Sequence, residues 1–195
     1  MTNMENLFAE QQELVSHIDA ALSRLGGYSN SKLRGDICCR VVMDYLSKHV
    51  PKAYRIVGPN VWVAGFPTEF DLAVVASDAR PKRFSAIYPA EGVRLLIEVK
   101  QSGVFARRDE LQSKLERVYE DFQAVSTEHE HISWLYLTVR EVTRPKKPRS
   151  IDFLARTRDV LGNDRVACLR DSRTPDLLPG EWDRAVDLVV RACMR

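Results

Sequence analysis

The sequence has few of the features that mark membrane, secreted or zinc-finger proteins. Its strongest apolar run, VRLLIEV at residues 93–99, is interrupted by an arginine, whereas a membrane-spanning helix needs about 20 apolar residues. The opening segment, MTNMENLFAEQQEL, has neither the basic start nor the apolar centre of a secretory signal. Only four cysteines are present, and none belongs to a Cys-x-x-Cys pair. We therefore expect a cytoplasmic protein with reduced thiols, no cysteine-based zinc site and no membrane partner.

The composition is that of an ordinary globular protein. Hydrophobic residues make up 45% of the chain and charged residues 29%, which excludes a disordered or collagen-like chain. At about 150 residues per domain, the 195 residues correspond to one domain with room for an added arm. The formal charge of +2 does not by itself indicate a nucleic-acid-binding protein.

The N-terminal segment predicts an amphipathic helix over residues 4–25. Gly26 and Gly27 end it. We interpret residues 1–27 as a helical arm and residues 28–195 as a single domain. The apolar stripe of the arm packs either on the chain's own core or on a second copy, which would make a homodimer. The stripe consists of Leu7, Leu14, Ile18, Ala21 and Leu25.

The rest of the chain alternates between patterns typical of helices and strands. Ser31 is a candidate cap for a helix that runs to about Val50, and Gly58-Pro59-Asn60 predicts a hairpin turn. The order predicts an α/β fold with a central mixed β-sheet flanked by helices. The predicted strands are 54–57, 61–63, 69–76, 93–100, 132–139 and 165–169, residues 77–91 form a loop, and the later helices are 107–125, 151–161 and 182–192.

Acidic residues stand inside two of the apolar strands. Side chains alternate along a strand, so Glu98 and Lys100 share one face. Asp71 lies within the preceding apolar strand, and it would converge with Glu98 if the two strands pair as neighbours. Two carboxylates at one point repel each other unless a cation lies between them. Oxygen ligands of this kind suit Mg²⁺ or Mn²⁺.

This arrangement resembles a known nuclease superfamily. Asp71, followed after 26 residues by Glu98-Val99-Lys100, resembles the PD-(D/E)XK pattern of restriction endonucleases, Holliday-junction resolvases and defence nucleases. The likeness covers about residues 31–139 and includes the order helix, strands, helix, strand. The segments KLRGDICCRVVMDYLSKHVPKAYRIVG, TEFDLAVV and VRLLIEVKQSG are similar to a bacterial branch of that superfamily. The resemblance implies a restriction-endonuclease-like core with an N-terminal helical arm.

The resemblance also implies a role for each site residue. Asp71 and Glu98 would bind Mg²⁺ or Mn²⁺, with the backbone carbonyl of Val99 as a further ligand. Lys100 would orient or help to deprotonate the attacking water, and Gln101 would contact substrate or water. The function implied is a metal-dependent endonuclease that hydrolyses phosphodiester bonds of DNA, with RNA as another substrate to consider, in a restriction, defence or repair context.

One position departs from the superfamily pattern. The early helix commonly carries a glutamate that holds the metal, and in this sequence the position falls at Cys39. Asp36, one turn earlier, is the candidate replacement. Without such a residue the chain would be a non-catalytic nucleic-acid-binding or assembly domain on the same fold. A third alternative is a small structural or toxin–antitoxin partner protein whose N-terminal helix pairs with another chain. Glu-x-Lys alone is also typical of a surface salt bridge at a strand end.

The basic residues are unevenly distributed. Residues 140–158 contain seven basic and two acidic side chains, whereas residues 107–130 contain four basic and seven acidic ones. The first stretch and the loop at residues 80–83 would contact phosphates, or they would be ordinary solvated loops. Phosphate contacts carry no sequence information, so base specificity is not predicted. The candidate nucleic-acid contacts are Arg144, Lys146, Lys147, Arg149, Lys82 and Arg83.

Overall fold

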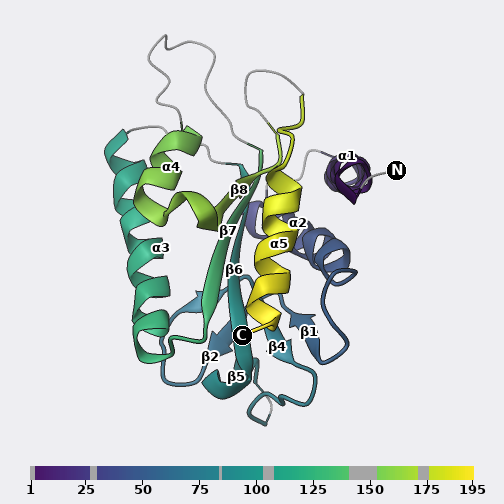
Figure 1. The fold of residues 1–195 in the computed structure, drawn as a ribbon. Helices are drawn as coiled ribbons and strands as arrows, with labels where there is room; N and C mark the ends of the chain where they lie inside the picture. Colours follow the sequence, from purple (N-terminus) through teal and green to yellow (C-terminus); the bar gives the residue numbers. More distant parts are fainter. Residues whose placement is uncertain (1–2, 27–29, 84, 103–107, 141–152, 171–175) are drawn as a thin grey trace.

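A five-stranded mixed sheet forms the centre of the protein in a computed structural model (Figure 1). The structure describes residues 3–26, 30–83, 85–102, 108–140, 153–170 and 176–195. The strand order is β1-β4-β6-β7-β8, with antiparallel pairing from β1 to β6 and parallel pairing from β6 to β8. The predicted α/β class with a central mixed sheet is therefore confirmed. The strands of this sheet are β1 (Tyr54–Val57), β4 (Leu72–Ala76), β6 (Val93–Ser102), β7 (Ser133–Arg140) and β8 (Val166–Cys168).

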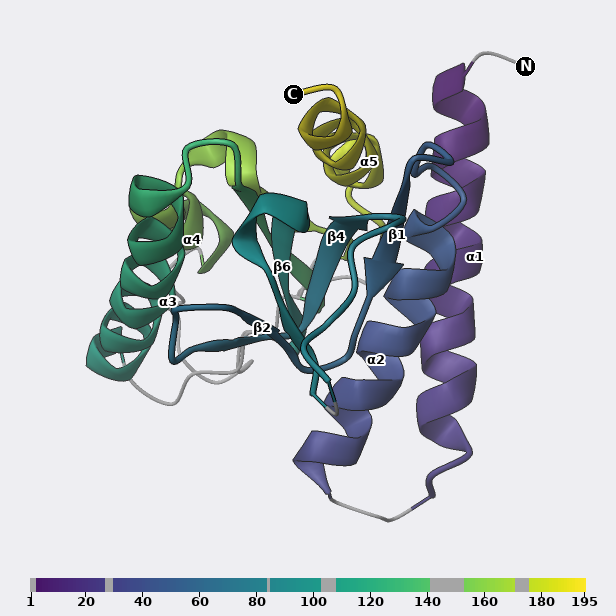
Figure 2. The ribbon, with the colours of Figure 1, turned by 90° about the horizontal axis from the view of Figure 1, so that it is seen from below.

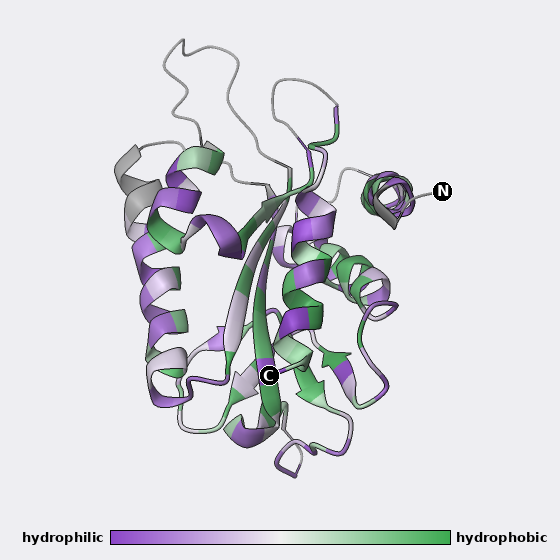
Figure 3. Cartoon of the chain, in the orientation of Figure 1, coloured by the Kyte–Doolittle hydropathy of each residue, from purple (hydrophilic) through white to green (hydrophobic). Residues whose placement is uncertain are grey.

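Helices cover both faces of this sheet. Helices α1, α2 and α5 pack on one face, and α3 and α4 pack on the other together with a small second sheet (Figure 2). Figure 3 shows hydrophobic residues along the strands of the central sheet, as expected for strands buried on both faces. The helices are α1 (Asn3–Ser23), α2 (Ser31–Leu46), α3 (Arg108–Glu128), α4 (Phe153–Leu161) and α5 (Glu181–Cys193).

The predicted hairpin between residues 54–57 and 61–63 is wrong. Strand β1 pairs with β4 in the central sheet, whereas β2 (Val61–Val63) pairs with β3 (Glu69–Phe70) and β5 (Ile87–Tyr88) in the second sheet. The turn therefore carries the chain from one sheet to the other. A Cβ on Gly58 would lie 2.4 Å from the Leu72 side chain and 2.7 Å from the Asp71 carbonyl, so only glycine fits this close approach.

The predicted strand over residues 69–76 is divided into two. Residues before Asp71 pair with β2, and residues after it pair with β1 and β6. Asp71 lies at the point where the chain passes between the sheets, and its backbone carbonyl accepts a hydrogen bond from the Asn60 N–H at 3.1 Å. This break places an acidic side chain at the end of β4 rather than within a continuous strand.

Three smaller predictions also need correction. Asn30, not Ser31, caps α2, because its side chain accepts a hydrogen bond from the Leu33 N–H at 3.1 Å. The same helix ends at Leu46 rather than near Val50. The predicted loop over residues 77–91 contains β5, whose two residues are too few to show a strand periodicity.

Helix α1 packs on the chain's own core, the first of the two alternatives left open by its sequence. Leu14, Val15, Ile18 and Leu22 are buried in the cluster that also includes residues of α2 and α5. Gln11 is fully buried and donates to the backbone carbonyls of Leu169 and Leu178 at 2.8 and 3.0 Å. The division into an arm and a domain at residue 27, and a homodimer through this helix, stay predictions. Within the described part of the chain, no helix is long and apolar enough to cross a membrane.

Candidate active site

The pairing of β4 with β6 brings two acidic residues together. Leu72 lies opposite Ile97 in this antiparallel ladder, so Asp71 comes next to Glu98 one position further on. The Val99 backbone N–H donates to Oδ2 of Asp71 at 2.8 Å. Asp71 comes just before Leu72, the first residue of β4. Its side chain thus accepts the hydrogen bond that extends the pairing with β6 by one step. The convergence expected from the sequence depended on these strands being neighbours, and the structure pairs them.

Lys100 completes a cluster of three charged side chains. Its Nζ contacts Oε1 of Glu98 and lies 3.7 Å from Oδ2 of Asp71. The Glu98 side chain is 16% exposed, that of Asp71 26% and that of Lys100 40%. The cluster is therefore partly buried, with Lys100 as its most exposed member.

The surroundings of Glu98 favour its neutral form. Burial raises the pKa of Glu98 to about 7, and the Asp71 charge also raises it, while Lys100 lowers it. For Lys100, burial lowers the pKa, but the charges of Glu98 and Asp71 outweigh burial and raise it above the ordinary lysine value. The lysine therefore stays charged at neutral pH, whereas the glutamate is close to its titration midpoint.

Two further residues contribute to the electrostatics of the cluster. Burial in α2 raises the pKa of the Cys39 thiol, and the Asp71 charge raises it further, so this thiol is neutral. Burial also raises the pKa of Tyr136, which pairs with Glu98 across the ladder between β6 and β7. Sequence reasoning did not select Tyr136. The alternating pattern of residues 132–139 is the sequence signal that could have indicated Tyr136 as a neighbour of Glu98.

The early helix α2 places a buried thiol within electrostatic range of the cluster. Cys39 interacts electrostatically with Asp71, Glu98 and Lys100, and its alignment with the usual glutamate position stays a prediction. Asp36 lies on the same helix and is half-buried. In the ranges that the structure describes, no three His, Cys, Asp or Glu side chains gather where they could hold a metal ion. Asp36 as a metal ligand stays a prediction.

The donors at the cluster fit a hard divalent cation in kind and in number. Mg²⁺ is commonly held by one or two carboxylates and keeps several of its waters. Asp71 and Glu98 supply two carboxylates, whose mutual repulsion a cation would relieve. The N–H and C=O of one strand residue point to the same edge of the strand, so the Val99 carbonyl lies on the edge where its N–H binds Asp71.

The remaining predicted residues lie elsewhere. Gln101 follows Lys100 on β6, but its side chain lines a cavity with residues of α1 and α2, on the opposite face of the sheet from Glu98 and Lys100. Lys82 and Arg83 are exposed in the loop before β5. Arg144, Lys146, Lys147 and Arg149 lie outside the described residues.

The central mixed sheet and its flanking helices form a restriction-endonuclease-like fold. Comparison with solved structures gives the particular likeness, to NucC, a nuclease of the PD-(D/E)XK type. For the cAAA-bound form of NucC from P. aeruginosa ATCC27853, the TM-score is 0.60 at 15% identity, over 100% of this chain and 90% of the other. For the cAAA-bound form from E. coli MS115-1, it is 0.60 at 16% identity, over 100% and 89%. At such identities the likeness is one of fold, and it confirms the fold that the PD-(D/E)XK resemblance implied.

Neither a protein-family model nor a curated protein matches the sequence.

Proposed function

We propose that this protein is a Mg²⁺- or Mn²⁺-dependent endonuclease that hydrolyses phosphodiester bonds of DNA in the cytoplasm, in a restriction, defence or repair context. The observation that carries the proposal is the convergence of Asp71, Glu98 and Lys100 at one point. The restriction-endonuclease-like fold supports it, because the same fold was implied by the sequence pattern of these three residues.

Each residue of the cluster has a definite task in this reaction. Asp71 and Glu98 would hold the cation, together with the Val99 carbonyl. When bound, the cation supplies a Lewis acid and lowers the pKa of a coordinated water. Lys100 keeps a positive charge at neutral pH beside two carboxylates that would otherwise repel the phosphate. Its ammonium orients the attacking water and stabilises the negative charge that develops on the phosphate.

The test is cleavage of a supercoiled plasmid in Mg²⁺, in Mn²⁺ and in EDTA. We expect cleavage only with metal, and Lys100→Ala should reduce the rate by about 100-fold or more, within the range for loss of a positioned catalytic group. Asp71→Asn should reduce it comparably while its amide oxygen still accepts from the Val99 N–H. Lys52→Ala, on an exposed lysine, is the matched control. Cleavage by Lys100→Ala at the wild-type rate would exclude this mechanism. RNA is tested in parallel.

One observation favours a second candidate function. The early helix presents the neutral Cys39 thiol where related enzymes carry a glutamate. A non-catalytic nucleic-acid-binding or assembly domain on the same fold would need no such ligand. It predicts salt-sensitive DNA binding without cleavage under any divalent metal. Metal-dependent turnover that is lost in Asp71→Asn would eliminate this alternative.

A further inference from the structure

A cavity lies on the face of β6 that turns away from the catalytic cluster. Its volume is about 400 Å³, within the range of small-ligand sites. Gln101 near the end of β6, Val139 near the end of β7 and Arg170 just after β8 form one side, and α1 and the first turn of α2 form the other. The described lining residues are Ile18, Asp19, Leu22, Ser23, Gly26, Arg34, Gln101, Val139 and Arg170.

The position of the cavity is one that ligands commonly occupy. Strands β6, β7 and β8 are parallel, and all three contribute from their carboxyl ends. In open α/β sheets, ligands bind outside the carboxyl ends of the parallel strands, because side chains and loops from several strands meet there. The sheet topology therefore favours a binding site at this position, whatever the chemistry of the lining residues.

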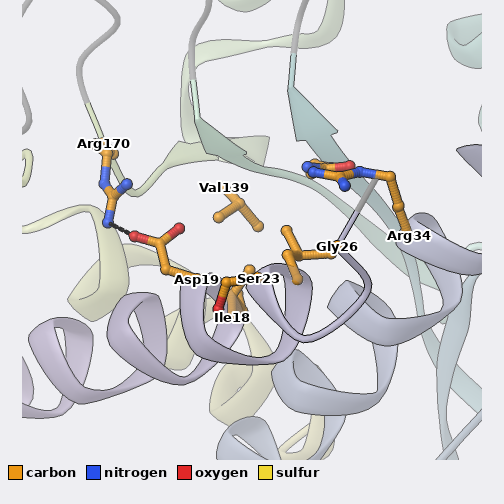
Figure 4. Close-up of a pocket in the computed structure, with 9 residues that line it drawn as sticks. Ile18, Asp19, Ser23, Gly26, Arg34, Val139 and Arg170 are labelled. Atoms are coloured by element: carbon orange, nitrogen blue, oxygen red, sulfur yellow. Dashed lines mark hydrogen bonds and ion pairs between the residues drawn. The ribbon is translucent and has the colours of Figure 1, made fainter. Parts of the chain in front are cut away.

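Two guanidinium groups give the cavity its charge. In Figure 4, Arg34 and Arg170 reach in from opposite sides, with Val139 between them and α1 beneath. Arg170 donates from Nη2 to Oδ2 of Asp19 at 2.7 Å, so one carboxylate offsets only part of the positive charge. The Nε atom of Arg170 is buried and has no hydrogen-bond partner in the described structure. A buried donor of this kind calls for an acceptor.

These features point to an anion rather than to a purely structural contact. The Arg170–Asp19 ion pair alone would explain how α1 is held, but it leaves the Arg34 side chain and the open volume without a role. Guanidinium groups match phosphate geometry, since their N–H donors form parallel hydrogen bonds with two oxygens. The volume admits a group larger than a free phosphate ion.

We propose that this cavity binds a phosphate group of nucleotide chemistry, carried either by a free nucleotide or by the backbone of a nucleic-acid strand. Arg34 and Arg170 hold the phosphate, and Gln101 contacts the attached nucleoside. The site goes beyond the proposed nuclease function and does not need it, because the side chains that form it lie across the sheet from Glu98 and Lys100.

The experiment is equilibrium binding in EDTA, so that cleavage does not interfere, with AMP, adenosine and a 12-nucleotide single-stranded DNA as probes. We expect wild-type protein to bind AMP or the DNA, and adenosine much more weakly. Arg34→Gln should weaken binding by about tenfold, the loss typical of one charge-assisted hydrogen bond. Arg40→Gln, an exposed arginine on the same helix, is the matched control. Circular dichroism of each variant confirms that it is folded.

A change of opposite sign makes the test sharper. Asp19→Asn removes the one carboxylate in the described lining and should tighten binding roughly two- to fivefold. Binding of AMP identifies a free nucleotide as the source of the phosphate, and binding of the DNA alone identifies a strand. Equal binding of AMP and adenosine, wild-type binding by Arg34→Gln, or no binding of AMP or DNA would each overturn the proposal. AMP binding by Lys100→Ala separates this result from the fate of the nuclease proposal.

Discussion

The two faces of the last part of β6 carry opposite chemistry. One face presents Glu98 and Lys100 beside Asp71, a cluster in which two carboxylates surround one ammonium. The other face presents Gln101 at a cavity where two guanidinium groups outnumber one carboxylate. Because side chains alternate along a strand, four consecutive residues serve both regions. A single strand thus separates a cluster in which carboxylates outnumber the ammonium from a cavity in which guanidinium groups outnumber the carboxylate.

The largest expected effect tests how the cavity face is built. Ile18 of α1 is buried, lines the cavity and belongs to the core. We expect Ile18→Ala to lower the free energy of unfolding by about 2–5 kcal/mol, the usual cost of truncating a buried isoleucine. Urea denaturation measures this change, with Gln12→Ala on the exposed side of the same helix as control. A cost below about 1 kcal/mol would mean that α1 is a peripheral arm rather than one wall of this region.

The next effect is confined to the face that carries Glu98 and Lys100, and it depends on pH. The folded pKa of Glu98, about 7, lies above its ordinary value of 4.5, so the folded protein holds this proton more tightly than the unfolded chain does. The contribution of Glu98 to stability is therefore complete below pH 4.5 and is lost as the pH rises through 7. The pKa of Lys100 is raised from an already high value, so that group does not titrate in this window.

We expect the free energy of unfolding in EDTA to fall between about pH 5 and pH 8 by up to about 3 kcal/mol in the wild-type protein. Glu98→Gln should flatten this profile, because its side chain cannot ionise. Urea denaturation across the pH series is the measurement, and Glu91→Gln on an exposed glutamate is the control. Parallel profiles for wild type and Glu98→Gln would show that burial does not perturb this carboxyl.

The smallest effect on the chemical step is expected at Gln101. Its side chain lines the cavity across the sheet from Lys100, so Gln101→Ala should leave the kcat of cleavage within about twofold. Steady-state cleavage kinetics measure this constant. A large fall in kcat would show that Gln101 acts at the catalytic cluster, and the distinction between the two faces would fail.

The sequence predicted the proximity of Asp71, Glu98 and Lys100 better than it predicted the strand pairing around them. The apolar strands with Asp71 and Glu98 were visible as patterns, and alternation alone put Glu98 and Lys100 on one face. The same alternation puts Gln101 on the other face, so its separation from Lys100 was predictable. The superfamily resemblance instead implied that Gln101 acts beside Lys100.

The errors have a common physical origin in long-range packing. Residues 54–57 and 61–63 look like a hairpin locally, but β1 pairs with β4, and β2 pairs with β3 and β5. A turn motif carries no information about that choice. Strand β5 has two residues, and its existence depends on pairing with β2. Asn30 and Ser31 are both good caps, and only the three-dimensional course of the chain decides between them.

The hydrogen bond from the Val99 N–H to Asp71 makes the position of the Asp71 carboxylate depend on how β4 pairs with β6. A slip of β4 by a single residue would turn its buried side chains to the wrong face and would also withdraw the carboxylate from Glu98. The cluster therefore forms only when β4 and β6 pair in the correct register. A misaligned chain would carry the same residues without bringing Asp71, Glu98 and Lys100 together.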